Sequence, residues 1–297
     1  MNSVDFLITM KQLIIVTGLS GSGKSIALRA LEDSGYYCID NLPATMLPSI
    51  SEHLQSTKQT SNEFNAAKHD RVAISIDSRS AAIETLPAHI EQLKAQNINT
   101  QVLFLESNIE TLVKRFSETR RKHPLSRDTT TLAESIAFER ELLGDLGQLG
   151  HVIDTSNLSA NTLRGWVKDI VSTDHKGLTL LFTSFGFKHG IPLDADFVFD
   201  VRCLPNPHYD PQLRDLTGQD ALVQEFLNKQ NDVHEMLQDI RLYIEKWLPH
   251  FVTDNRSYLT VAIGCTGGQH RSVFFVEQLS QYFMPHQKVL TRHRELI

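Results

Sequence analysis

Eight residues near the start of the chain, at positions 18–25, combine three glycines and three serines with a lysine. They fit the phosphate-loop pattern G-x-x-x-x-G-K-[S/T] at each fixed position. In order they are Gly18, Leu19, Ser20, Gly21, Ser22, Gly23, Lys24 and Ser25. Glycines let successive backbone N–H groups turn toward one anion, and a helix N-terminus adds partial positive charge. We therefore expect a nucleotide site, with Lys24 reaching the β- and γ-phosphates and Ser25 holding Mg²⁺.

The segments on either side of this loop predict the framework that such a site needs. Residues 13–16 form a short apolar run, which is typical of a buried parallel strand. Residues 26–32 are rich in helix formers, and Gly35 ends that segment. A glycine turn before a helix, without any ligand, is the alternative, but the order of strand, glycine loop and helix favours a nucleotide site.

Two aspartates end predicted strands and are alternative candidates for steadying the Mg²⁺ ion. Asp77 ends the strand predicted at 72–77, and Asp40 ends the strand predicted at 36–40. A carboxylate in this position acts through the water shell of the ion. We favour Asp77 because its strand is more uniformly apolar, although either aspartate could instead cap a helix.

A second combination of strand, glycine loop and helix occurs around residues 264–272. A buried strand is predicted at 258–263 and a helix follows the loop through Phe283, so the loop is a second anion cradle. The residues expected at this anion site are Cys265, Thr266, Gly267, Gly268, Gln269, His270 and Arg271.

The spacing Cys265-x5-Arg271-Ser272 also matches the signature of tyrosine phosphatases. In those enzymes a thiolate attacks phosphorus while loop amides and the arginine grip the phosphoryl oxygens. Gly264 stands where those phosphatases carry a histidine, so we expect this loop to bind a phosphate without breaking it. A phosphatase acting through Cys265 and a tight turn around a buried thiol are the alternatives.

The order of predicted elements indicates two α/β domains, as a length of 297 residues favours. The polar segment 172–177 marks the boundary and gives domains 1–172 and 173–297. In the first domain we predict a doubly wound parallel sheet of the P-loop kinase type. Its further elements are strands at 101–106 and 152–155, helices at 110–119 and 161–171, and a polar connection at 56–70. In the second, we predict strands at 178–183 and 197–201, irregular segments at 184–190 and 204–211, and two helices within 221–247.

Composition restricts the classes of function and the cellular compartment. The net charge of −6 argues against a surface coated in positive charge for nucleic acid, so any RNA contact must use local patches. No apolar run approaches the length of a membrane span, and residues 1–9 lack the pattern of a signal peptide. Three widely spaced cysteines predict a reducing compartment without disulfides, hence the cytoplasm.

A cluster of basic residues lies at and after the end of the predicted helix 110–119. Its members are Lys114, Arg115, Arg120, Arg121, Lys122, His123 and Arg127. In P-loop kinases, arginines after such a helix often close over the transferred phosphoryl group. A kinase of a small sugar or nucleotide, with Arg120 and Arg121 in this role, is therefore an alternative function, and a solvated basic helix end is the structural alternative.

Taken together, these motifs closely resemble the RapZ family, also described as the YvcJ type, of bacterial nucleotide-binding RNase adapter proteins. The resemblance covers nearly the whole chain, from about Met10 to Arg294. Its motifs are the residues at 18–25, 27–33, 40–43, 184–190, 204–208 and 264–272. The presence of two such loops in one chain indicates this family far more specifically than a phosphate loop alone.

The resemblance implies an ATP-binding first domain and a second domain that binds RNA and senses an amino-sugar phosphate. A proposed GTP-contacting tetrapeptide of the family falls here on Asp77, Ser78, Arg79 and Ser80. The cofactor implied is ATP or GTP with Mg²⁺. The sugar-phosphate site, for glucosamine-6-phosphate, corresponds to the loop 265–271, with His208 facing it. In enterobacterial members the protein presents a small regulatory RNA to RNase E, which controls glucosamine-6-phosphate synthase, and the family suggests a homotetramer.

RNA binding follows from the resemblance alone, because the sequence lacks an aromatic RNA-binding signature. The basic residues that we consider first as RNA contacts are Arg121, Lys122, Lys288, Arg292 and Arg294. Enterobacterial relatives continue beyond this point into a basic tail.

Overall fold

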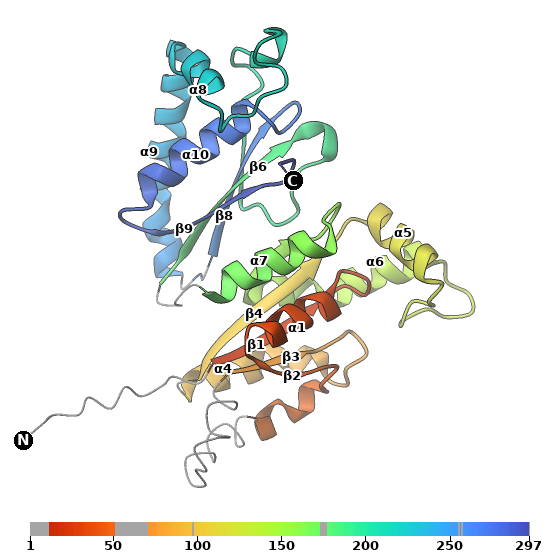
Figure 1. Ribbon diagram of the computed structural model, residues 1–297. Helices are drawn as coiled ribbons and strands as arrows, with labels where there is room; N and C mark the ends of the chain where they lie inside the picture. Colours follow the sequence, from red (N-terminus) through yellow and green to blue (C-terminus); the bar gives the residue numbers. More distant parts are fainter. Residues whose placement is uncertain are drawn as a thin grey trace, which may run out of the picture. The chain divides into compact units, whose positions relative to one another are not determined.

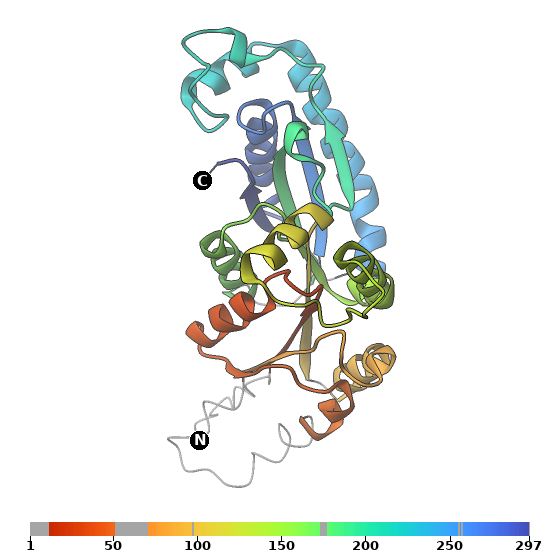
Figure 2. The same cartoon turned by 90° about the vertical axis from the view of Figure 1, so that its right-hand side faces the viewer.

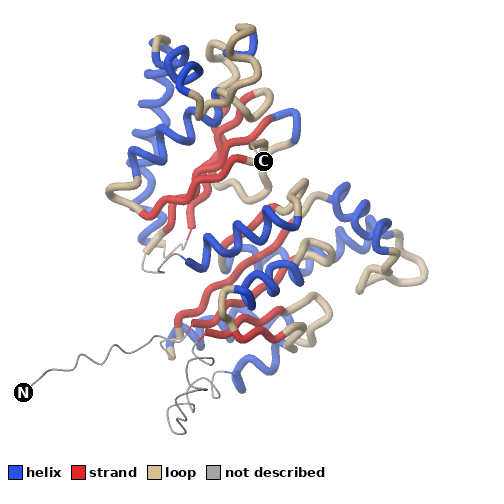
Figure 3. Tube along the Cα trace, viewed as in Figure 1, coloured by secondary structure: helices blue, strands red, loops and turns tan. Residues whose placement is uncertain are grey.

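The computed structural model describes residues 12–50, 71–96, 98–172, 177–254, 256 and 258–296. The chain divides into two compact units, Met1–Asp174 and His175–Ile297. Each unit has its own sheet, and Figure 3 shows the two groups of strands with their covering helices. In the described part of the chain, no helix is long and apolar enough to cross a membrane.

The N-terminal unit is built on five parallel strands in the order β2-β3-β1-β4-β5. Their bounds are β1 Gln12–Gly18, β2 Tyr37–Ile39, β3 Arg71–Ser75, β4 Asn99–Glu106 and β5 His151–Asp154. The central strand β1 is apolar and almost wholly buried, because helices cover both faces of the sheet. Since parallel strands end at one edge, the loops after β1, β3 and β5 meet there.

Helices pack on both faces of this sheet. Those with described bounds are α1 Lys24–Asp33, α4 Leu86–Ala95, α5 Ile109–Thr119, α6 Leu132–Leu143 and α7 Ala160–Ser172. Figure 2 shows α1 and α4 on opposite sides of the strands, and α7 packs beside α1. The core on the α4 side includes Leu13, Ile15 and Ile90. The predicted doubly wound parallel sheet is confirmed.

Helices α4 and α6 are absent from the sequence prediction, although both carry local signals for a helix start. Pro87 occupies the first turn of α4, where its missing N–H costs nothing. Thr131 and Glu134 form a reciprocal capping box at the start of α6. The polar connection predicted at 56–70 lies outside the described residues.

The C-terminal unit contains four parallel strands in the order β7-β8-β6-β9. The strands are β6 Thr179–Gly186, β7 Phe197–Asp200, β8 Tyr258–Cys265 and β9 Lys288–His293, and the helices are α8 Ala221–Asn228, α9 Asn231–Thr253 and α10 Arg271–Phe283. Helix α10 packs on β6, β8 and β9, and α9 packs against α10 (Figure 1). The prediction of two helices after residue 220 is confirmed.

One prediction for this unit is wrong. Residues 184–186, expected to be irregular, belong to strand β6, because they pair with residues 263–265 of β8 despite the glycine at the end. A short 3₁₀ helix, η4 Phe187–His189, follows directly. The edge strand β9, which pairs with β6, is absent from the sequence prediction.

Candidate functional site

The glycine loop at 18–25 connects β1 to α1 at the carboxyl edge of the N-terminal sheet. Gly18 has φ of +126°, and a Cβ there would lie 2.0 Å from the carbonyl oxygen of Leu105, so the chain needs a glycine at the turn. The loop borders a cavity of about 800 Å³, and residues 20–25 all line it. Within it, the Ser22 Oγ is buried and has no hydrogen-bond partner among the described residues.

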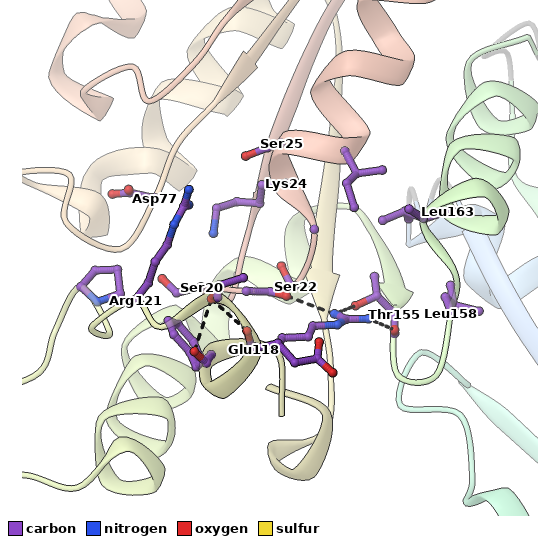
Figure 4. A pocket seen from close by; sticks show the side chains of 18 of the residues that line it. Ser20, Ser22, Lys24, Ser25, Asp77, Glu118, Arg121, Thr155, Leu158 and Leu163 are labelled. Carbon is purple, nitrogen blue, oxygen red and sulfur yellow. Dashed lines mark hydrogen bonds between the residues drawn. The ribbon is translucent and has the colours of Figure 1, made fainter. Parts of the chain in front are cut away.

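Lys24 folds back over the loop that carries it. Its Nζ donates to the carbonyl oxygens of Gly18 at 2.7 Å and Leu19 at 3.0 Å. Burial lowers the pKa of Lys24, and the negative charges of Glu139 and Asp77 oppose that shift. Figure 4 shows Lys24 and Ser25 between Asp77 and Arg121 on one side and Thr155, Leu158 and Leu163 on the other.

Asp77, which follows β3, lines the cavity as the sequence predicts for the acidic residue near the metal. It accepts hydrogen bonds from the Arg79 backbone N–H at 2.9 Å and from Arg79 Nε at 3.0 Å. Burial raises the pKa of Asp77, but the hydrogen bonds and charge of Arg79 outweigh burial and hold that pKa below its usual value. Asp40 is exposed and accepts from Ser75 Oγ at 2.5 Å. Of the two candidate aspartates, Asp77 lines the cavity and Asp40 does not.

The tetrapeptide 77–80 lies beside the glycine loop. Ser78 Oγ donates to Glu139 at 2.5 Å, and that same carboxylate accepts from the glycine-loop residue Ser20. Ser80 Oγ accepts from the Ala44 N–H at 2.6 Å. The segment predicted as a second nucleotide motif is thus joined to the first one through Glu139.

The predicted basic cluster separates into residues with different surroundings. Arg121 and Lys122 are exposed and line the cavity. Arg115 Nη1 donates to Gly21 O at 3.1 Å, and its Nη2 donates to Thr155 O at 2.7 Å, so it ties the glycine loop to the segment after β5. Arg120 ends α5 with φ of +52° and does not line the cavity. Of the two arginines expected to close over a phosphoryl group, only Arg121 is in position.

The opposite wall of the cavity is largely apolar and was not predicted from the sequence. Leu158, Ala160 and Leu163 line it beside Thr155 and Ser159, from the segment after β5 and the first turns of α7. A cavity with phosphate-binding groups at one end and leucines at the other matches the two halves of a nucleotide, its phosphates and its base. The sequence could have indicated this wall, because residues 155–160 follow the strand predicted at 152–155, and parallel strands all end at the edge that carries the glycine loop.

In the C-terminal unit, the loop 264–272 connects β8 to α10. Gly268 has φ of +76°, and a Cβ there would lie 2.6 Å from the Gly186 nitrogen, so the loop and the end of β6 approach closely. Cys265 is 3 % exposed. Its Sγ accepts from the Gly268 N–H at 3.2 Å and lies 3.1 Å from Ser272 Oγ.

Arg271 is 3 % exposed, and backbone carbonyl groups hold its guanidinium. Its Nη1 donates to the carbonyl oxygens of Arg202 and Leu204, both at 2.8 Å. Its Nη2 reaches Thr266 Oγ1 at 3.4 Å, while its Nε is buried without a partner among the described residues. The guanidinium therefore fixes the loop 202–204 and keeps only part of its donor fork for an anion.

Two histidines and a lysine lie close to this loop. The exposed ring of His208, the histidine expected to face the site, lies 6.3 Å from that of His270. Burial lowers the pKa of His270, and the nearby His208 lowers it further, against a hydrogen bond to the Leu213 carbonyl. Lys188 was not predicted to belong to this site. Its Nζ lies close to the loop, because a Cβ added to Gly267 would be 3.9 Å from it. Gln269 and Thr266 complete the loop.

The basic residues considered for RNA contact differ in accessibility. Arg121 and Lys122 are exposed. Lys288 and Arg292 lie in strand β9, and Arg292 is 5 % exposed. Arg294 follows the strand and its backbone N–H donates to Ser184 O at 3.2 Å. The segment is therefore integrated in the sheet of the C-terminal unit.

Comparison with known proteins covers both units. Residues 11–175 match the family described as RapZ-like N-terminal domain, and residues 178–297 match the family described as RapZ C-terminal domain. A "Nucleotide-binding protein" of Methylobacillus flagellatus is 64 % identical over 286 residues, which cover 96 % of this chain and 99 % of that protein. Its counterpart in Thiobacillus denitrificans is 57 % identical with the same coverage. Among solved structures, the match to a shikimate kinase from Bacteroides thetaiotaomicron has 13 % identity and a TM-score of 0.36, and covers 54 % of this chain and 98 % of that one.

Proposed function

This chain belongs to the RapZ family, and we propose that it is a nucleotide-binding regulatory protein that senses a sugar phosphate and acts on RNA. One observation carries the nucleotide part of the proposal. Lys24 and Asp77 lie together at a cavity of about 800 Å³ that the glycine loop borders and leucines line at the other end. A close relative is also named a nucleotide-binding protein.

The proposed ligand of the N-terminal unit is ATP or GTP with Mg²⁺. The exposed hydroxyl of Ser25 and the carboxylate of Asp77 supply the oxygen donors that Mg²⁺ prefers. The ion would offset phosphate charge. Lys24 would exchange its two bonds to loop carbonyls for phosphate oxygens, because a phosphate is the stronger, charge-assisted acceptor.

The proposed ligand of the C-terminal unit is glucosamine-6-phosphate. The loop 265–271 offers backbone amides at a helix N-terminus, which favour a phosphate group. Lys188 adds a cationic group beside it, and His208 adds an imidazole ring. Cys265 is buried and its sulfur is hydrogen-bonded within the loop, which supports binding of a phosphate ester without attack on phosphorus.

From the family we also propose an adapter role, in which the partners are a small regulatory RNA and RNase E. We propose in the same way that the protein forms a homotetramer and is located in the cytoplasm. The exposed Arg121 and Lys122 are the basic residues best placed to reach RNA. Because they also line the nucleotide cavity, we propose that nucleotide and RNA influence one another's binding.

A gel shift with a structured small RNA tests this role. We expect binding that falls steeply with salt and that weakens in Arg121→Ala and Lys122→Ala. The matched control is Lys94→Ala, because Lys94 is an exposed lysine of α4 paired with Glu91. Equal affinity at low and high salt, or equal weakening in the control, would contradict the proposal.

A kinase of a small sugar or nucleotide is the second candidate, because Arg121 lines the same cavity as Lys24. Transfer of labelled phosphate from ATP to such acceptors would favour the kinase, whereas ATP binding without transfer would favour the adapter.

A further inference from the structure

A single buried carboxylate, that of Glu139, joins three segments around the nucleotide cavity. Glu139 lies on α6 and is 0 % exposed. It accepts from Ser20 N at 2.8 Å and Ser20 Oγ at 2.7 Å in the glycine loop, and from Ser78 Oγ at 2.5 Å after β3. Its Oε2 also lies 3.1 Å from His123 Nε2.

The hydrogen bonds of His123 define its role in this cluster. Its Nδ1 accepts from the Leu125 N–H at 3.2 Å, so the ring proton is on Nε2 and is donated to Glu139. The ring is buried and packs on Phe116 at a centroid distance of 5.2 Å. Because Arg121, Lys122 and Pro124 on either side of it line the cavity, the contact between His123 and Glu139 fixes where those residues lie.

Every described partner of the Glu139 carboxylate donates an N–H or O–H group to it. Burial of a carboxylate is costly unless it is hydrogen-bonded in this way. The cluster therefore holds Ser20, Ser78 and His123 around one carboxylate.

We propose that Glu139 is a positioning residue of the nucleotide site, which fixes the glycine loop, Ser78 and the basic segment 121–124 around one ligand. This inference rests on the proposed nucleotide binding. Glu139 does not line the cavity, so it acts through Ser20, Ser78 and His123.

The test is ATP affinity, measured by titration calorimetry on the full chain, with the melting temperature of each variant as a separate readout. We expect Glu139→Gln to weaken binding about tenfold or more, since it removes an acceptor of several buried donors. We also expect Glu139→Asp, which keeps a carboxylate, to recover part of that affinity. The control is Glu134→Gln, whose side chain is an exposed cap of the same helix.

The outcomes separate the inference from the proposed function. Failure of the unmodified chain to bind any nucleotide would refute the function itself. If that chain binds ATP, an unchanged ATP affinity in folded Glu139→Gln would overturn the inference. An affinity of Glu139→Asp no higher than that of Glu139→Gln would indicate only a structural role and would also overturn it. Should Glu139→Gln fail to fold, Ser78→Ala decides. It removes one donor to the carboxylate, and we expect severalfold weaker ATP binding, so an unchanged affinity would also overturn the inference.

Discussion

Replacing Arg271 with alanine tests whether a buried guanidinium holds the anion loop of the C-terminal unit in place. The Nη1 of Arg271 donates to the carbonyl oxygens of Arg202 and Leu204 at 2.8 Å each, and the side chain is 3 % exposed. Alanine leaves both carbonyls without this donor, and each unsatisfied buried group costs about 1–3 kcal/mol. We therefore expect the unit to lose about 2–6 kcal/mol of stability. At about 4 °C per kcal/mol for a unit of this size, its melting temperature should fall by about 8–24 °C.

Differential scanning calorimetry of the full chain measures this change. The matched control is Arg202→Ala, because the Arg202 side chain is exposed and pairs with the exposed Asp200, and such surface pairs contribute little. A melting temperature for Arg271→Ala within about 2 °C of the unmodified chain would refute the reasoning. In that case Arg271 would serve a bound anion only, and its loss would affect ligand affinity without affecting stability.

Two further predictions concern ionisation. Burial raises the pKa of Asp77, but hydrogen bonds from Arg79 outweigh burial and lower that pKa below 3.8. Ionised Asp77 therefore stabilises the folded chain above about pH 3.8, and this contribution is lost as the pH falls through the lowered pKa. Asp77→Asn lacks this contribution, so its melting temperature between about pH 3 and pH 6 should lie below that of the unmodified chain by an amount that shrinks only at the acid end. Iodoacetamide at about pH 8 should modify the exposed Cys203 first, because burial raises the pKa of Cys38 to about 11 and Cys265 is buried. Peptide mass spectrometry checks this order, and faster labelling of Cys265 would contradict it.

The parts of the fold that the sequence predicts are those specified by local pattern. The glycine loop, its strand and its helix are contiguous, so spacing alone indicates their arrangement. Asp77 could be placed near Lys24 because parallel strands end at one edge of a sheet. The same reasoning located the loop 264–272 between β8 and α10.

The parts that the sequence did not predict depend on contacts between distant segments. Glu139 meets Ser20 across 119 residues, and nothing in the spacing of α6 indicates that its glutamate turns inward. Strand β9 carries Lys288 and Arg292, whose charges suggest a solvated tail, yet pairing with β6 places them in a sheet. Lys188 lies in a short 3₁₀ helix, and only the fold brings it to the anion loop.

The central claim is that the N-terminal unit binds a nucleotide through Lys24, and titration calorimetry with ATP and Mg²⁺ tests it most directly. We predict that the unmodified chain binds ATP and that Lys24→Ala weakens binding by about 1.5–3 kcal/mol, the range for a hydrogen bond to a charged group, or roughly 10- to 150-fold in Kd. Lys94→Ala, which changes an exposed lysine on α4, should bind as the unmodified chain does. A Lys24→Ala protein that is folded by circular dichroism and binds ATP with unchanged affinity would contradict the claim.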